Sequence, residues 1–294
     1  MPYLTHTQWS GRTDGTPWMQ RSLISLYRVL PLWALYAVMA WVVPFYMLFN
    51  REGYRSIYQL FRQRLGHSPV RSFLLTYCNH FRFGQVVLDR FAVFAGKRFK
   101  VDVDGMDHFD RLAHAESGFV ILSSHVGCYE VAGYTLTSHD KPFNALVFGG
   151  ETTTVSEQRS RVLSGHNIST IQVSPDMSHI FALNAALDRH EIVSLPADRH
   201  FGSRKTALCS FLGAPAPFPV GAYALARAKS VPLLAIFAVK TRLRHYHIIV
   251  RPCSDVGQYA AQLEAVVRQY PTQWFNFYDF WSTQGMKDDL GSKK

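Results

Sequence analysis

The stretch GFVILSSHVGCYE, residues 118–130, decides how the chain around it folds. Its first half is a short, continuous apolar run, which is typical of a strand covered on both faces in a parallel sheet. A tight turn should follow through Val126 and Gly127, because glycine permits a sharp bend. The segment CYEVAGYTL, residues 128–136, predicts a helix. His125 is therefore expected at the carboxyl edge of a sheet, with Glu130 in the first helical turn.

Other short β-runs alternate with helical stretches along the chain. Apolar or alternating runs predict strands at 98–105, 118–124, 143–148, 191–196, 231–240 and 243–252, and helical periodicity predicts helices at 56–66, 68–96, 155–165, 176–190, 219–230 and 259–270. This order predicts an α/β fold with a mostly parallel central sheet flanked by helices. We expect an N-terminal membrane-anchoring segment (1–50), a main α/β domain (51–285) and a polar tail (286–294).

Composition favours a membrane surface as partner over nucleic acid. Of the 294 residues, 18% are charged, whereas soluble domains carry about 25%. The net charge is +10, which suits an anionic lipid surface. The sequence has no zinc-finger spacing, RNA-binding aromatic signature or arginine-rich run, so nucleic acid is not expected. The four cysteines are widely spaced, and neither a disulfide framework nor a metal site is predicted.

A long apolar segment near the N-terminus should contact the membrane. Between Arg28 and Arg51 the chain contains no Asp, Glu, Lys or Arg, and a spanning helix needs about 20 mostly apolar residues. Trp33 and Trp41 are aromatic side chains of the kind found at membrane interfaces. Pro44 should kink or end the helix. Three arrangements stay open: a single transmembrane helix, a helix lying in the interface, and a buried core helix.

His125 and Glu130 form a candidate catalytic pair. Their spacing brings them together in neither a strand nor a helix, but the turn through Gly127 could do so. A carboxylate bonded to one ring nitrogen fixes the tautomer and makes the other nitrogen a general base. A solvent-exposed helix-capping pair is the alternative. Cys128 offers a different chemistry, that of a nucleophile in a thioesterase or hydrolase, while no G-x-S-x-G elbow indicates a serine hydrolase.

Substrate is expected at the loops that follow the central strands. In an open parallel sheet, ligands bind outside the carboxyl ends of the strands. The charged loop after residues 191–196 could contact a phosphate or carboxylate of the acceptor, or the donor carrier, and a solvated loop is the alternative. The candidate substrate-binding residues are Ser124, Gly127, Cys128, Gly149, Asp198, Arg199, Arg204 and Lys205.

Three motifs, in order, resemble one known family. SSHVGCYE (123–130) resembles the His-x4-Asp/Glu motif of the lysophospholipid acyltransferase superfamily, and most closely its bacterial lipid A biosynthesis (lauroyl/myristoyl) branch. Residues 193–240 and the segment YPTQWFNFYDFW (270–281) are similar to later segments of that branch. Two departures concern the acceptor head group: no arginine occurs near LVFGG (146–150), and His200 replaces a second acid.

The resemblance implies a membrane-bound acyltransferase that needs no cofactor. His125, oriented by Glu130, would be the general base for transfer from an acyl-carrier-protein or CoA thioester to a hydroxyl or amine. It also implies oxyanion donors at the N–H groups of Gly127 and Cys128. The expected partners are acyl carrier protein, anionic lipids and a lipid acceptor. The acceptor would be a lipid A precursor of lipopolysaccharide synthesis, at the cytoplasmic face of the bacterial inner membrane.

Other acceptors and other activities stay open. The acceptor could instead be an aminoacyl or polyene lipid, or the enzyme could be an acyl thioesterase. A membrane-bound binding protein that kept the fold without catalysis is the third class.

Overall fold

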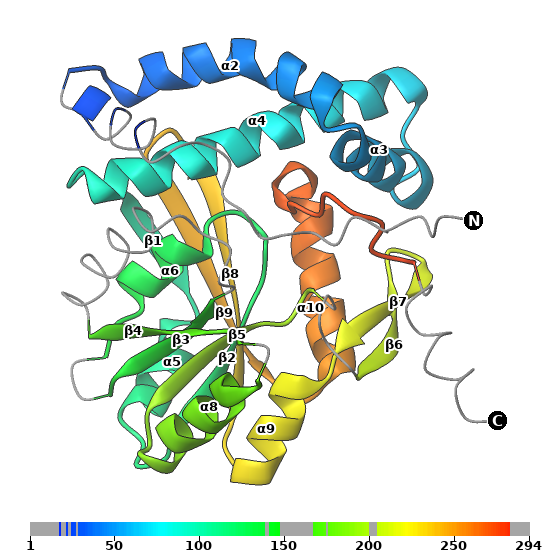
Figure 1. Ribbon diagram of the computed structural model, residues 1–294. Helices are drawn as coiled ribbons and strands as arrows, with labels where there is room; N and C mark the ends of the chain where they lie inside the picture. The colour runs from blue at the N-terminus through cyan, green and yellow to red at the C-terminus, as the bar shows by residue number, and fades with distance from the viewer. Residues whose placement is uncertain are drawn as a thin grey trace.

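A central sheet with helices on both faces forms the body of the protein. The computed structural model describes residues 18, 22, 25–27, 29–138, 141–147, 167–174, 176–199 and 205–282. The seven strands of the sheet found there have the order β1-β9-β8-β2-β5-β3-β4 (Figure 1). Their bounds are β1 Lys100–Asp104, β2 Phe119–Ser123, β3 Phe143–Val147, β4 Ile168–Gln172, β5 Ile192–Pro196, β8 Leu233–Arg242 and β9 His245–Cys253.

The sheet is mostly parallel, as predicted. Strands β8, β2, β5, β3 and β4 run in one direction, while β9 is antiparallel to β8 and parallel to β1. Helices α5 (Met106–Ala113) and α6 (Tyr129–Thr135) pack on one face; α8 (Ser178–Asp188), α9 (Gly221–Lys229) and α10 (Val256–Gln269) pack on the other. Successive residues of β2 enter these two cores alternately, and all of 119–122 are buried. Burial on both faces explains the continuous apolar run.

Some elements were not anticipated from the sequence. These are β4, α5 and the antiparallel hairpin of β6 (Thr206–Phe211) and β7 (Ala214–Pro219). Proline cannot donate to a ladder and occurs in edge strands, so the APAPFP sequence of β7 obscured the strand. The helix predicted at 155–165 lies outside the described residues, as does the polar tail.

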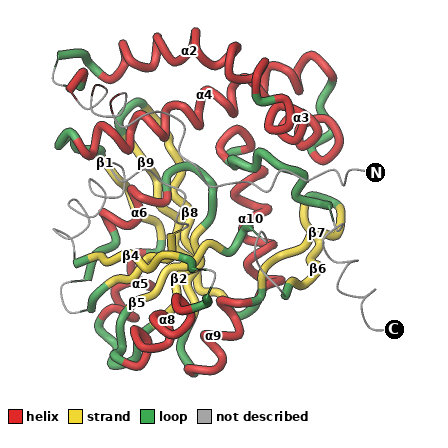
Figure 2. Tube along the Cα trace, in the orientation of Figure 1, coloured by secondary structure: helices red, strands yellow, loops and turns green. Residues whose placement is uncertain are grey.

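The N-terminal helices form a layer over one end of the sheet, as Figure 2 shows. They are α2 (Leu32–Phe49), α3 (Arg51–Gln59), the π-helical turn η1 (Leu60–Arg64) and α4 (Pro69–Phe94). Helix α2 continues through Pro44 instead of ending there. It lies antiparallel along α4: Met39 fits against Gly84, and the Tyr77 hydroxyl donates to the Ala40 carbonyl at 3.0 Å. Only 22% of α2 is buried, so it is not a core helix.

A buried polar network joins this layer to the sheet. Asp89 of α4 and Lys240 of β8 form an ion pair at 2.5 Å. The hydroxyls of Tyr36, from α2, and Tyr246, from β9, both donate to the Asp89 carboxylate. Breaking a buried ion pair costs about 3–5 kcal/mol. Helices α2 and α4 are thereby held as one unit to the end of the sheet where β8 finishes.

Candidate active site

His125 and Asp198 meet at the carboxyl edge of the sheet. Ser123 of β2 and Pro196 of β5 are partners in the parallel register, and each candidate residue lies two positions further along its chain. The His125 Nδ1 is 2.8 Å from Asp198 Oδ1, and the His125 backbone N–H donates to Oδ2 at 2.7 Å. The His125 side chain is 23% exposed and that of Asp198 only 1%. A reachable ring is thus backed by a buried carboxylate.

Glu130 does not provide the carboxylate that contacts the ring. It lies in the first turn of α6, as predicted, but there it forms an ion pair with Arg90 of α4, with 2.7 Å between Oε2 and Nε. The predicted contact between His125 and Glu130 is therefore wrong, and Asp198 makes that contact instead. Adjacent parallel strands place His125 and Asp198 side by side at the same edge of the sheet, whereas the first turn of α6 places Glu130 against α4.

The charges of the pair suit a general base. Burial and the positive charge of Arg199 lower the pKa of His125, more than Asp198 raises it. Burial alone would raise the pKa of Asp198, but His125 and Arg199 lower it overall. At neutral pH the carboxylate is ionised and the imidazole neutral. The carboxylate can only accept, so it selects the tautomer with hydrogen on Nδ1 and leaves the Nε2 lone pair available.

Gly127 makes the turn between β2 and α6 possible. Its φ is +58°, and a Cβ there would lie 2.0 Å from the Ala238 carbonyl oxygen. The Gly127 N–H donates to the Gln273 carbonyl and the Cys128 N–H to the Ala238 carbonyl, both at 2.8 Å. The prediction that these two N–H groups stabilise an oxyanion is therefore wrong, because both are already bonded within the protein.

Ser124 and Cys128 belong to the same turn. The Ser124 side chain is buried, and its Oγ accepts the Val126 N–H at 3.3 Å. Cys128 is also buried; burial, followed by the charge of Glu130, raises the pKa of its thiol to about 12. The thiolate is the nucleophilic form, so this environment disfavours Cys128 as a nucleophile. Substrate contact by Ser124, Gly127 or Cys128 stays a prediction.

The charged loop after β5 is only partly described. The Arg199 guanidinium donates to the Phe275 carbonyl at 2.7 Å and lies 5.6 Å over the Tyr278 ring. It is thus anchored beside the catalytic pair. Lys205 is exposed and precedes β6. Gly149, Arg204, Phe148 and His200 lie outside the described residues.

The C-terminal segment is a part of the site that sequence reasoning did not identify. It follows the short helix η2 (Pro271–Gln273). The Trp274 indole N–H donates to Asp198 Oδ2 at 3.2 Å, and the Phe275 N–H donates to the His125 carbonyl at 3.0 Å. The Gln273 side chain bonds both backbone groups of Lys240, at 2.7 and 2.9 Å. The available sequence signal was the Tyr-Pro-x-Gln-Trp element within residues 270–281, which by itself assigns no role to Trp274.

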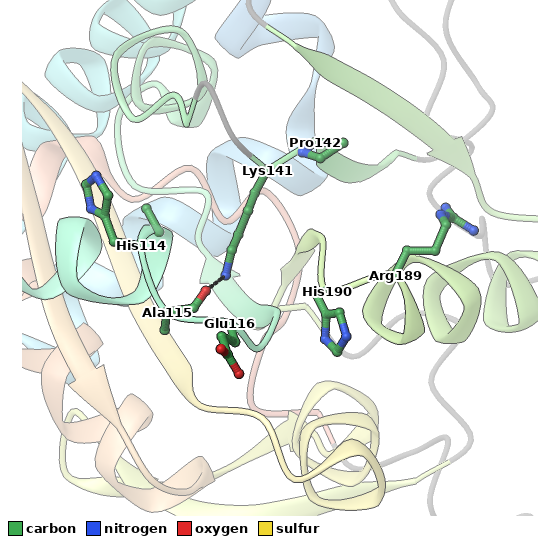
Figure 3. Close-up of a pocket in the computed structure, with 8 residues that line it drawn as sticks. His114, Ala115, Glu116, Lys141, Pro142, Arg189 and His190 are labelled. Atoms are coloured by element: carbon green, nitrogen blue, oxygen red, sulfur yellow. Dashed lines mark hydrogen bonds between the residues drawn. The ribbon is translucent and has the colours of Figure 1, made fainter.

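A separate pocket of about 330 Å³ lies at the opposite, amino edge of β3 and β5 (Figure 3). Its most buried charge is Lys141, whose ammonium group donates to the carbonyls of Leu112, Ala115 and Ser117. The Lys141 ammonium group therefore already donates to three backbone carbonyls of the protein. His125 and Asp198 lie at the other end of the strands, which separates this pocket from the candidate active site.

Comparisons with known proteins identify a family. A family model described as bacterial lipid A biosynthesis acyltransferase matches residues 95–283, a range that includes His125, Asp198 and Trp274. No curated protein matches the chain. Among solved structures, the 1-acyl-sn-glycerophosphate (LPA) acyltransferase from Thermotoga maritima is similar, with 13% sequence identity and a TM-score of 0.34. The likeness covers 95% of this chain and 99% of that chain.

Proposed function

Because the chain belongs to the family of bacterial lipid A biosynthesis acyltransferases, we propose that it moves a fatty acyl chain from a carrier thioester to a hydroxyl or amine of a membrane lipid. The observation that carries this mechanism is the His125–Asp198 pair, with 2.8 Å between Nδ1 and Oδ1. The pair combines a neutral, reachable base with a buried anion. General-base catalysis of an acyl transfer needs both.

The reaction follows from this geometry. His125 Nε2 takes the proton of the acceptor hydroxyl or amine, and the freed nucleophile attacks the thioester carbonyl carbon. The new C–O or C–N bond forms, the C–S bond breaks, and the imidazolium returns the proton to the leaving thiolate. Asp198 stabilises the imidazolium during these steps. Such proton transfer contributes about 10²–10⁴-fold to a rate.

The family description supports a proposal for the acceptor, and the charge of the protein supports one for the donor. Its printed description names lipid A biosynthesis, which supports a lipid A precursor as acceptor. We propose an acyl-carrier-protein or CoA thioester as donor and a location at the cytoplasmic face of the bacterial inner membrane. The net charge of +10 supports attraction to acidic carriers and anionic lipids.

An exposed apolar surface on the N-terminal helices suits a membrane. We call it the apolar face of α2 and α4. It consists of large exposed side chains: Trp33, Val38, Trp41, Val42, Phe45, Leu48 and Phe49 on α2, and Val70, Phe73 and Leu74 on α4. Contiguous exposed apolar surface of this kind marks an interaction site. Exposed basic residues lie near it: Arg51 and Arg55 after α2, and Lys97 and Arg98 after α4.

We propose that α2 lies in the membrane interface instead of crossing the bilayer. Its inner side is packed along α4, and α4 carries the buried Asp89–Lys240 ion pair. A spanning α2 would have to leave α4, taking Tyr36 away from Asp89. Because the inner side of α2 is held against α4 and its outer side is apolar and exposed, α2 would contact lipid with its axis in the plane of the headgroups. This places the apolar face in lipid and the active site beneath α4.

The enzymatic proposal is tested with purified protein, radiolabelled acyl-carrier-protein or acyl-CoA, and a bacterial lipid extract. His125→Ala should lower the transfer rate at least about 100-fold. His114→Ala is the matched control, because His114 is an exposed histidine on the far edge of the sheet. Mass spectrometry of lipids from cells with and without the gene identifies the acceptor. Undiminished transfer by His125→Ala would refute the general-base mechanism.

The interfacial proposal is tested by sedimentation with vesicles that contain phosphatidylglycerol. Phe45→Asp removes an apolar contact from the apolar face of α2 and α4, whereas Phe181→Asp changes an exposed phenylalanine on α8. Burying one phenylalanine side chain is worth about 1.5–3 kcal/mol, so Phe45→Asp should weaken vesicle binding about 10- to 100-fold. Equal binding by both variants would show that α2 does not contact lipid.

A further inference from the structure

We propose that Trp274 is a positioning residue for the His125–Asp198 pair. The inference rests on the proposed function for its catalytic meaning. Asp198 receives hydrogen bonds on both oxygens: the His125 ring on Oδ1, and the His125 backbone N–H together with the Trp274 indole on Oδ2. With Oδ2 held by two donors, the carboxylate cannot rotate, and Oδ1 stays directed at the ring.

Trp274 is itself held rigidly. Its side chain is 1% exposed. The ring packs edge-to-face against Phe211, Phe280 and Trp281, with centroid distances of 5.2, 5.1 and 6.1 Å. Asn79 of α4 donates to the Trp274 backbone carbonyl at 2.9 Å. The indole N–H therefore has a fixed direction, which is the requirement for a group that orients another.

The same segment also holds the backbone of the catalytic turn. Trp274 and Val126 form an antiparallel bridge, and the neighbouring Phe275 N–H donates to the His125 carbonyl at 3.0 Å. Trp274 thus contacts the Asp198 carboxylate through its indole, and the residue after His125 through its bridge to Val126. Packing alone would not require the indole nitrogen to face Asp198.

Loss of the indole N–H should change both the rate and the titration of His125. Hydrogen bonds to charged groups are strong enough that losing one lowers a rate about 10- to 100-fold. With one donor fewer, Asp198 keeps more of its negative charge and stabilises the imidazolium better. His125 should then titrate at higher pH than in the unmodified protein.

Other charged and titratable groups near the pair are left in place by this change. These groups are Arg199 on the loop after β5, Tyr259 on α10, Tyr278 on the C-terminal segment and the Tyr129 ring on α6. A shift in the titration of His125 therefore reports the indole itself.

The test compares Trp274→Phe with Trp281→Phe. Both variants lose an indole N–H from the same aromatic cluster, but that of Trp281 donates to the Phe211 carbonyl, at 3.3 Å, and not to Asp198. A second form carries β-(3-benzothienyl)alanine at position 274, which replaces the N–H with sulfur and keeps the volume, so that folding is preserved. In the two position-274 forms only, we expect kcat to fall about 10- to 100-fold with KM little changed. In the same two forms, the acidic limb of the pH profile should move upward.

The titration of His125 is also followed by NMR in protein with labelled histidine, with His125→Gln to assign the signal. This measurement needs no substrate. Absence of transferase activity in the unmodified protein would refute the proposed function, while the NMR titration would still decide the role of Trp274. An unshifted His125, or equal losses in Trp274→Phe and Trp281→Phe, would overturn the positioning role.

Discussion

Replacing Asp198 with Asn separates the observed catalytic pair from the one that the motif suggests. Asp198→Asn keeps the size of the side chain and removes its charge. The general base then loses the anion that stabilises its protonated form. We expect acyl transfer to become much slower while the fold is retained, because the amide still fits the same space.

The size of the effect follows from the distance. The His125 Nδ1 and Asp198 Oδ1 are 2.8 Å apart, which places the two charge centres roughly 4 Å apart, and at an effective dielectric constant of about 20 their attraction is about 4 kcal/mol. Each 1.36 kcal/mol is a factor of ten in rate, so kcat should fall about 1,000-fold. Asp198 raises the pKa of His125; without that charge the acidic limb should move to lower pH.

The matched variant is Glu130→Gln. It removes the charge that pairs with Arg90 and leaves the His125–Asp198 contact intact. We expect a loss of stability of about 3–5 kcal/mol, measured by urea unfolding, with the pH profile unchanged. Single-turnover acyl transfer is the assay for both variants. The assignment of Asp198 would be refuted if Glu130→Gln lost turnover while Asp198→Asn kept activity within about tenfold of the unmodified protein. That result would support the His125–Glu130 pair predicted from the sequence.

Three further outcomes test the turn and the base. Gly127→Ala should lower the free energy of unfolding, measured in urea, by more than about 3 kcal/mol, because the new Cβ would clash with a backbone carbonyl. Gly66 also has a positive φ, but nothing lies near its Cβ position. Gly66→Ala should therefore lower the free energy of unfolding by only about 1–2 kcal/mol. Cys128→Ala should retain kcat, and mass spectrometry after thiol labelling of the native protein should find exposed Cys78 modified and buried Cys128 unmodified. Because the pKa of His125 is lowered and the neutral ring is the base, kcat/KM should decline only below about pH 6.5; a decline beginning well above this value would contradict the charge assignment.

Much of the fold could be predicted from local patterns. The apolar run of β2 and the glycine turn after it indicate a parallel strand followed by a helix, and both form. The same patterns did not indicate β4, because its sequence ISTIQ is short and largely polar. They did not indicate β7 either, because its prolines are atypical of strands. Local sequence reports propensity and burial, and it fails where a strand is short or lies at an edge.

The sequence alone determined that His125 follows a buried strand, that Asp198 lies in a loop at the same edge of the sheet, and that residues 32–49 are apolar. Only the tertiary structure decided which acid touches the ring. Strands β2 and β5 are far apart in the chain but adjacent in the sheet, and their register sets His125 beside Asp198. Strand order and register arise from packing of the whole domain, so a motif of eight residues directs attention to Glu130, whereas long-range pairing selects Asp198.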